Sequence, residues 1–213
     1  MRICENMKTE IIKIKGDWED VVDGCRETVS KPPLGHEPSE EFKEKILIAE
    51  HEPIREIEIK WRWRSIAYWI AMHWKTHIWP SRTNTQRDDR TGINRDDSPQ
   101  NEPVTFTGRA NPQHLIDTFR KRLCFKAHAR TRKYAISLKK TLLQYKMLKQ
   151  ISGVLVPNCV YRAGCPEIKM CKERVWPEFV KYCKEHADQH PGLMSISQRY
   201  AWYNAYFYEN EKE

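Results

Sequence analysis

The sequence contains no apolar run that approaches the 18 residues a helix needs to cross a membrane. Its N-terminal stretch, MRICENMKTEIIKIKGDW, also lacks the apolar core of a secretory signal peptide. These two absences predict a soluble, cytoplasmic protein that does not associate with membranes. The seven cysteines, an odd number without an export signal, then favour reduced thiols or metal ligands over a disulfide framework.

The chain is basic, with 37 Lys and Arg against 29 Asp and Glu and a formal net charge of +8. Such a balance favours phosphate-bearing partners, either nucleotides or nucleic acid. A length of 213 residues with 39% hydrophobic side chains is sufficient for one core. We therefore expect an α+β core over residues 1–158 and a second segment over 159–213, which contains cysteines, a helix and an aromatic C-terminal tail.

The stretch from Ile54 to Gly92 combines a strand, a Trp-rich helix and a polar turn. Apolar and charged residues alternate over Ile54–Trp61, which predicts a strand with one buried face. Apolar residues then recur at three- and four-residue steps, which predicts a helix capped by Ser65 and stopped by Pro80. The turn that follows is rich in arginine, so we expect it to hold an anion.

The remaining pattern completes an α+β arrangement. Residues 10–15 and 104–107 read as further strands, and Ser39 caps a helix over 40–49. Asn111 followed by Pro112 marks a strong helix start, and 112–151 forms one helix or two. We expect a mixed antiparallel sheet with long helices packed on one side.

Three separated motifs resemble the flavin-dependent thymidylate synthase family. They are the His51-Glu52-Pro53 entry to the central strand, the string Thr85-Gln86-Arg87, and the eleven-residue spacing of Asn111 and Arg122. The resemblance covers residues 25–161. It implies methylation of dUMP to dTMP with FAD as cofactor and NADPH and methylene-tetrahydrofolate as co-substrates, by a homotetramer whose active sites form between subunits.

The resemblance also implies roles for individual residues. Arg122 would face a pyrimidine carbonyl oxygen where negative charge develops, which makes it the candidate catalytic residue. The implied substrate-binding residues are Thr85, Gln86, Arg87, Arg90 and Arg122, whose arginines suit a phosphate. The implied cofactor-binding residues are His51, Lys75, His77, Asn111, Asp117 and Lys126.

Several positions depart from the family pattern. Lys75-Thr76-His77 stands where the family has R-H-R, and Asp88, Asp117 and Lys126 replace a Tyr, an Asn and a His. A second function therefore stays open: a protein without flavin chemistry that holds nucleotides or single-stranded nucleic acid by stacking on exposed tryptophans. Those tryptophans would be Trp61, Trp63, Trp69 and Trp74. Transfer of a hydroxymethyl group in place of methyl is a third possibility.

The candidate residues also have purely structural interpretations. Arg87 and Arg90 beside Asp88 and Asp89 are also typical of a self-paired, solvated turn. The run around Arg122 is equally typical of an exposed helix face. His73 and His77 have the i, i+4 spacing of metal ligands, but packed or solvent-facing histidines are the more common outcome.

The cysteines near the C-terminus form a separate pattern. Cys159, Cys165 and Cys171 follow one another at six-residue steps. This supply of thiols predicts either a structural zinc site or a group of buried thiols, since the spacing is not that of the common zinc modules.

Overall fold

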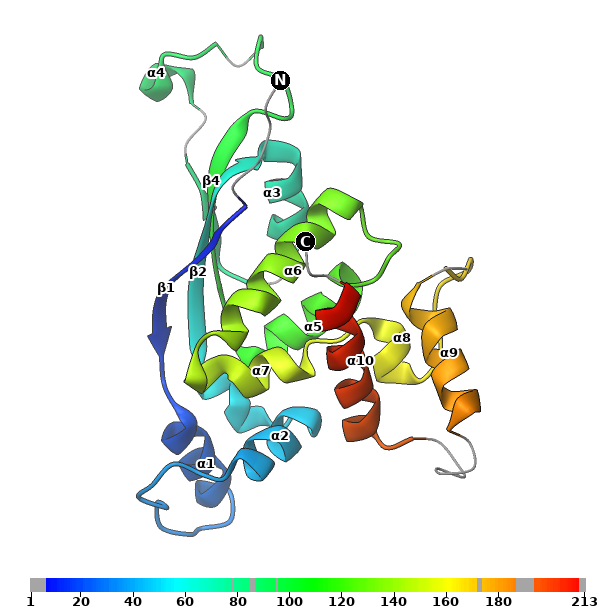
Figure 1. Cartoon of the computed structure of the whole chain (residues 1–213). Coiled ribbons are helices and arrows are strands. Elements are labelled where there is room, and N and C mark those ends of the chain that lie inside the picture. Colours follow the sequence, from blue (N-terminus) through cyan, green and yellow to red (C-terminus); the bar gives the residue numbers. More distant parts are fainter. Residues whose placement is uncertain are drawn as a thin grey trace.

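The computed structural model of the chain describes residues 7–77, 79–84, 87–94, 96–171, 174–186 and 194–210. Within these residues a four-stranded antiparallel sheet has the order β1-β2-β4-β3 (Figure 1). The strands are β1 (Thr9–Lys15), β2 (Glu58–Ala67), β3 (Ser81–Thr83) and β4 (Pro103–Ala110). The strands predicted at 10–15 and 104–107 are thereby confirmed.

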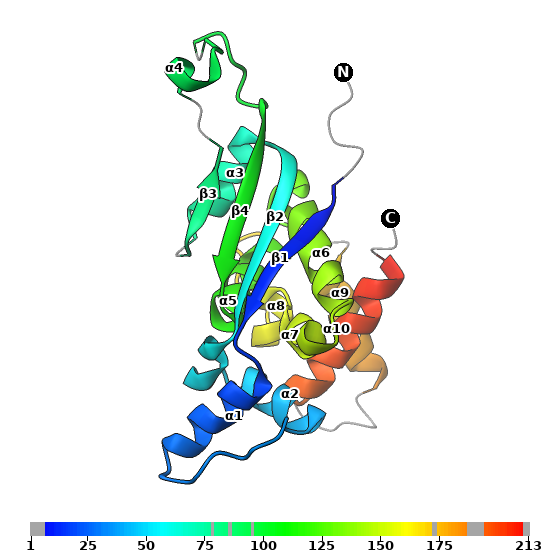
Figure 2. The same ribbon diagram turned by 90° about the vertical axis from the view of Figure 1, so that its left-hand side faces the viewer.

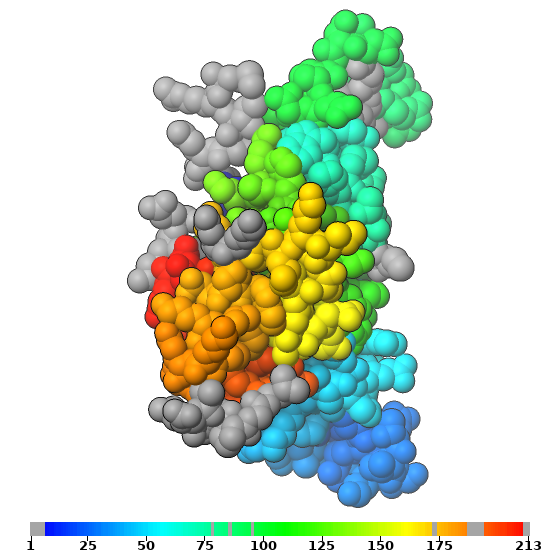
Figure 3. Space-filling model, turned by 90° about the vertical axis from the view of Figure 1, so that its right-hand side faces the viewer, coloured from blue at the N-terminus to red at the C-terminus, as the bar shows by residue number. Residues whose placement is uncertain are grey.

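Most of the helices lie on one side of this sheet, and the opposite face stays open (Figures 1 and 2). On the far side from the sheet, α8 and α9 form much of the surface (Figure 3). The helices before β4 are α1 (Trp18–Glu27), α2 (Glu40–Ile48), η1 (Glu52–Glu56), α3 (Tyr68–Lys75) and α4 (Asp88–Thr91). Those after β4 are α5 (Pro112–Arg122), α6 (Ala129–Leu143), η2 (Lys146–Leu148), α7 (Lys149–Val154), α8 (Asn158–Arg162), α9 (Val175–Glu185) and α10 (Ile196–Asn210). The expected α+β class is confirmed.

Both ends of β2 differ from the sequence prediction. Residues 52–56 form the 3-10 helix η1 with Pro53 in its first turn, so the strand begins only at Glu58. It then continues through Ser65, which the sequence had suggested as a helix cap. Ser65 adopts a φ of 54° at a register irregularity between Trp63 and Ile66, and this bulge lets the strand extend to Ala67 before α3 begins.

Two helices begin at the capping residues that the sequence predicts. The Ser39 hydroxyl accepts a hydrogen bond from the Phe42 N–H at the start of α2. The Asn111 side chain accepts one from the His114 N–H at the start of α5. The stretch 112–151 is interrupted after Arg122, so α5 and α6 are separate helices.

The tryptophans form the centre of the core. Trp61, Trp63 and Trp74 are fully buried, and Trp63 donates its indole N–H to the Thr9 hydroxyl at 2.8 Å. Trp61 lies against Gly108 on β4, where a Cβ atom would come within 2.4 Å of its ring. Because these three rings are buried, the predicted stacking of nucleic-acid bases on them is wrong.

None of the helices in the described part of the chain has the length and apolarity needed to span a bilayer. At the C-terminal end, α10 buries Tyr200, Tyr203 and Phe207 in the same core as the sheet. The aromatic tail thus packs against the core through these three residues.

Candidate functional site

A cavity of about 910 Å³ opens at one face of α5, next to the end of α3. Its wall is polar and carries several cations, because α5 turns its apolar side to the core and its polar side outward. The lining residues are Arg55, Thr76, His77, Asn111, Gln113, His114, Asp117, Thr118, Arg120, Lys121, Asn158, Tyr161 and Arg162. This volume is in the range of small-molecule sites.

Arg122 lies behind His77 and does not itself line the cavity. Its Nε donates to His77 Nε2 at 2.8 Å, and its Nη2 donates to the His73 carbonyl oxygen at 2.6 Å. The guanidinium also stands 6.0 Å from the centre of the Trp74 ring. Within this single chain, the hydrogen bonds of Arg122 direct its charge to His77, and its place at a pyrimidine carbonyl oxygen stays a prediction.

The protonation of His77 follows from this arrangement. Burial, with the charges of Arg122 and Lys121, lowers the pKa of His77 to about 4. The ring is then neutral at physiological pH, and since Nε2 accepts from Arg122, the ring proton is assigned to Nδ1. His77 is thus a neutral hydrogen-bond donor whose other ring nitrogen accepts a hydrogen bond from the Arg122 cation. Burial also lowers the pKa of Arg122 from its usual value.

A second polar network joins three lining residues of the cavity, Gln113, Asp117 and Arg120, to Glu50. Arg120 pairs with Glu50 and, at 3.2 Å, with Asp117, while Gln113 donates to the Glu50 carboxylate at 2.7 Å. The Arg120 guanidinium lies 3.5 Å from the centre of the Tyr161 ring. Burial opposes the charge on Arg120, but ion pairing with Glu50 outweighs it and raises the pKa of Arg120. The network holds these lining side chains of α5 in place.

The predicted cofactor-binding residues divide into two groups. His77, Asn111 and Asp117 line the cavity, although the Asn111 oxygen is used as the helix cap and Asp117 pairs with Arg120. His51 and Lys75 are exposed and do not line it. Lys126, also exposed, borders a separate hollow formed with the cysteines.

The predicted phosphate-binding turn lies apart from the cavity. Arg87 and Arg90 belong to the segment around α4, which projects beyond the end of the sheet, whereas α5 and α8 lie beside its middle and lower part (Figures 1 and 2). Arg87 makes hydrogen bonds of 2.9 and 2.5 Å to both oxygens of Asp89. Thr85 and Gln86 lie outside the described residues. Within one chain, Arg87 is therefore paired inside its own turn, and phosphate binding by Arg87 and Arg90 stays a prediction.

Four cysteines line one small hollow: Cys124, Cys159, Cys165 and Cys171. All are free thiols, and burial raises the pKa of Cys159 to about 12. Among the described residues, no group of three or more His, Cys, Asp or Glu side chains is placed to hold a metal ion. Only Cys159 of the four is buried and the other three are half-buried, so the buried-thiol interpretation applies to Cys159 alone.

The sequence interpretation missed most of the cavity wall. Glu50, Arg120 and Tyr161 were not predicted as site residues, and Glu50 meets Arg120 from 70 positions away. One local signal existed: Gln113, Asp117 and Arg120 recur at four- and three-residue steps and form a polar stripe on α5. Glu50, which lies between α2 and η1, and Tyr161 of α8 have no such signal.

The fold and this site define an α+β protein with a cationic, nucleotide-sized cavity beside α5. No family model and no curated protein sequence matches the chain. Among solved structures, it is similar to the crystal structure of a UMP/dUMP methylase, PolB from Streptomyces cacaoi, bound with 5-Br dUMP. The TM-score is 0.55 at 10% sequence identity, over 69% of this chain and 94% of that one. This similarity establishes the fold.

Proposed function

We propose that this protein is an enzyme that methylates the base of a pyrimidine nucleotide of the UMP or dUMP type. The proposal rests on one observation: His77, a neutral hydrogen-bond donor, lines the cavity beside α5 and is held there by a hydrogen bond from Arg122. Support comes from the fold, which is similar to that of a methylase bound to a dUMP analogue.

The chain's own residues would bind and orient the nucleotide. Arg55, Lys121 and Arg162 supply positive charge for a phosphate. His77 Nδ1–H would donate to a carbonyl oxygen of the pyrimidine, and the nearby charge of Arg122 would strengthen that bond as negative charge develops. Arg122 is accordingly a positioning residue.

The cofactor is also proposed. His77, Asn111 and Asp117 line the same cavity as the cations, which fits a phosphate-bearing dinucleotide such as FAD. A bound reduced flavin would supply the hydride that completes a methyl group delivered from methylene-tetrahydrofolate, with NADPH as reductant. Arg87 and Arg90 lie too far from the cavity of their own chain to contact a phosphate there (Figures 1 and 2). In a homotetramer, they would contact a phosphate bound to a neighbouring copy.

The first test is the visible absorption spectrum of the purified full-length protein, before and after addition of FAD and dUMP. We expect a flavin band that dUMP perturbs. A protein that stays colourless with excess FAD but binds dUMP would support the binding-only alternative, and absence of binding to both would refute the proposal.

Variants then test the role of Arg122. We expect Arg122→Ala to lower turnover by about 10²–10³ fold, the usual effect of removing one electrostatic stabiliser. NMR should show the pKa of His77 rising in this variant, because the lost charge is one of its causes. Arg64→Ala removes an exposed arginine of β2 and serves as control. Equal turnover in both variants would contradict the assignment.

A further inference from the structure

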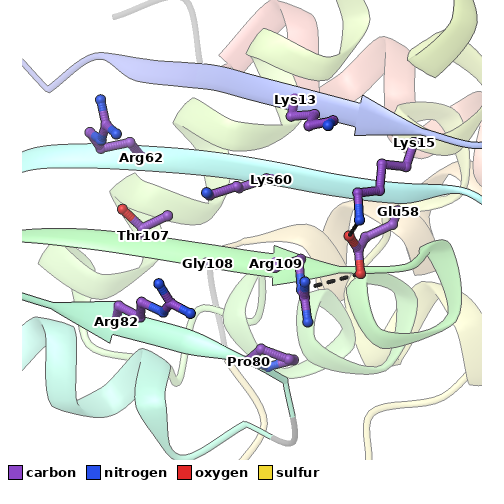
Figure 4. A pocket seen from close by; sticks show the side chains of 10 residues that line it. All are labelled: Lys13, Lys15, Glu58, Lys60, Arg62, Pro80, Arg82, Thr107, Gly108 and Arg109. Carbon is purple, nitrogen blue, oxygen red and sulfur yellow. Dashed lines mark ion pairs between the residues drawn. The ribbon is translucent and has the colours of Figure 1, made fainter.

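The open face of the sheet is a basic surface with no assigned role. A hollow of about 470 Å³ lies on it and is lined by residues of all four strands (Figure 4). Six of the ten lining residues are cations and one is a carboxylate; the cations are Lys13, Lys15, Lys60, Arg62, Arg82 and Arg109. This surface is separate from the cavity beside α5, with which it shares no lining residue.

The strand register places these cations in rows. Lys13 is directly opposite Lys60, and Lys60 is directly opposite Arg109, so three neighbouring strands present like charges side by side. In the next row, Arg62 and Arg82 flank Thr107. Like charges directly opposite each other destabilise a sheet unless an anion neutralises them. The arrangement therefore favours an anionic ligand.

Half of the positive charge has no partner among the described residues. Glu58 pairs with Arg109 at 3.2 Å and with Lys15 at 3.8 Å, and Glu10 lies 3.6 Å from Arg62. Lys13, Lys60 and Arg82 make no ion pair in the described part of the chain. Neighbouring strands are about 4.8 Å apart, so a row of three cations extends over about 10 Å. That spacing suits several phosphates and not one.

We propose that this face binds the phosphate backbone of duplex nucleic acid without reading its sequence. The lining side chains include no aromatic ring, so the base stacking on which single-strand binders depend is missing. They also lack the large apolar anchor typical of a protein interface, and a second copy of this face would be repelled. A duplex displays its phosphates outward at high charge density and needs neither feature.

The test measures binding of the full-length protein to a fluorescent duplex of about 20 base pairs, by anisotropy, at salt concentrations from roughly 50 to 200 mM. If three cations each neutralise one phosphate, this fourfold rise in salt weakens binding at least about 40-fold. We expect Lys13→Ala/Lys60→Ala/Arg82→Ala to lower the slope of log affinity against log salt by about 2.7.

A control variant, Lys31→Ala/Lys133→Ala/Lys169→Ala, removes the same charge from exposed positions elsewhere and should keep the slope. Thermal melts establish that both variants fold. The proposal is overturned if the two variants weaken binding equally, or if the wild type does not bind the duplex. Tighter binding of a single strand of the same length, or equal competition by polyglutamate, would also refute it.

Discussion

Lys139 makes the stability of the protein depend on pH in a direction that can be worked out from its surroundings. The side chain is completely buried on α6, and its Nζ donates to the Ser152 carbonyl oxygen at 2.6 Å and to Asn204 Oδ1 at 2.8 Å. The rings of Tyr203 and Phe207 lie 5.7 and 5.2 Å away. No carboxylate in the described residues pairs with it. Burial therefore lowers the pKa of Lys139 to about 7.

The sign follows from proton linkage. In the unfolded chain this lysine has a pKa of about 10.4, so between pH 7 and pH 10 the unfolded state holds more protons than the folded one. The free energy of unfolding must then rise with pH over that window. Integration from pH 7 to pH 9 gives about 2 kcal/mol from this group alone.

Urea denaturation of the wild type and of Lys139→Met at pH 7, 8 and 9 measures the effect. The wild type should gain about 2 kcal/mol relative to the variant across this range. Subtracting the variant cancels other groups, such as Cys159, whose raised pKa acts in the opposite direction. Lys133→Met, at an exposed position of the same helix, should follow the wild type. Parallel curves for the wild type and Lys139→Met would refute the reasoning.

Three further predictions concern single positions. Gly108→Ala should lower the free energy of unfolding by about 1–3 kcal/mol in urea, because its Cβ would meet the buried Trp61 ring, whereas Gly153→Ala, with open space, should not. Asn111→Ala should cost about 1 kcal/mol in thermal unfolding through loss of the helix cap, and Asn111→Asp should retain it. His77 should titrate near pH 4 by NMR. Because its pKa in the folded protein is below its value in the unfolded chain, His77 should lower the free energy of unfolding as the pH falls from about 6.5 to 4. A titration midpoint near pH 6.5 would contradict the burial of His77 beside Arg122.

Some elements were predictable because their signals are local. The alternation in β1 and β4, the Ser39 cap and the Asn111-Pro112 start each depend on residues within a few positions of one another. The α+β class follows from the same periodicities, since they state which side of each element must be buried. The start of α3 was mispredicted because the bulge at Ser65 depends on pairing with β4, which is distant in the sequence.

The composition and the order of elements thus determined a basic α+β protein with helices on one side of an antiparallel sheet. Only the tertiary structure decided that Arg122 binds His77, that Glu50 pairs with Arg120, and that three cations line up across β1, β2 and β4. These contacts join segments separated by tens of residues, and a shift of one residue in strand register would turn the cations to the other face. Periodicity fixes which face of an element is polar, but packing and register fix which polar groups meet.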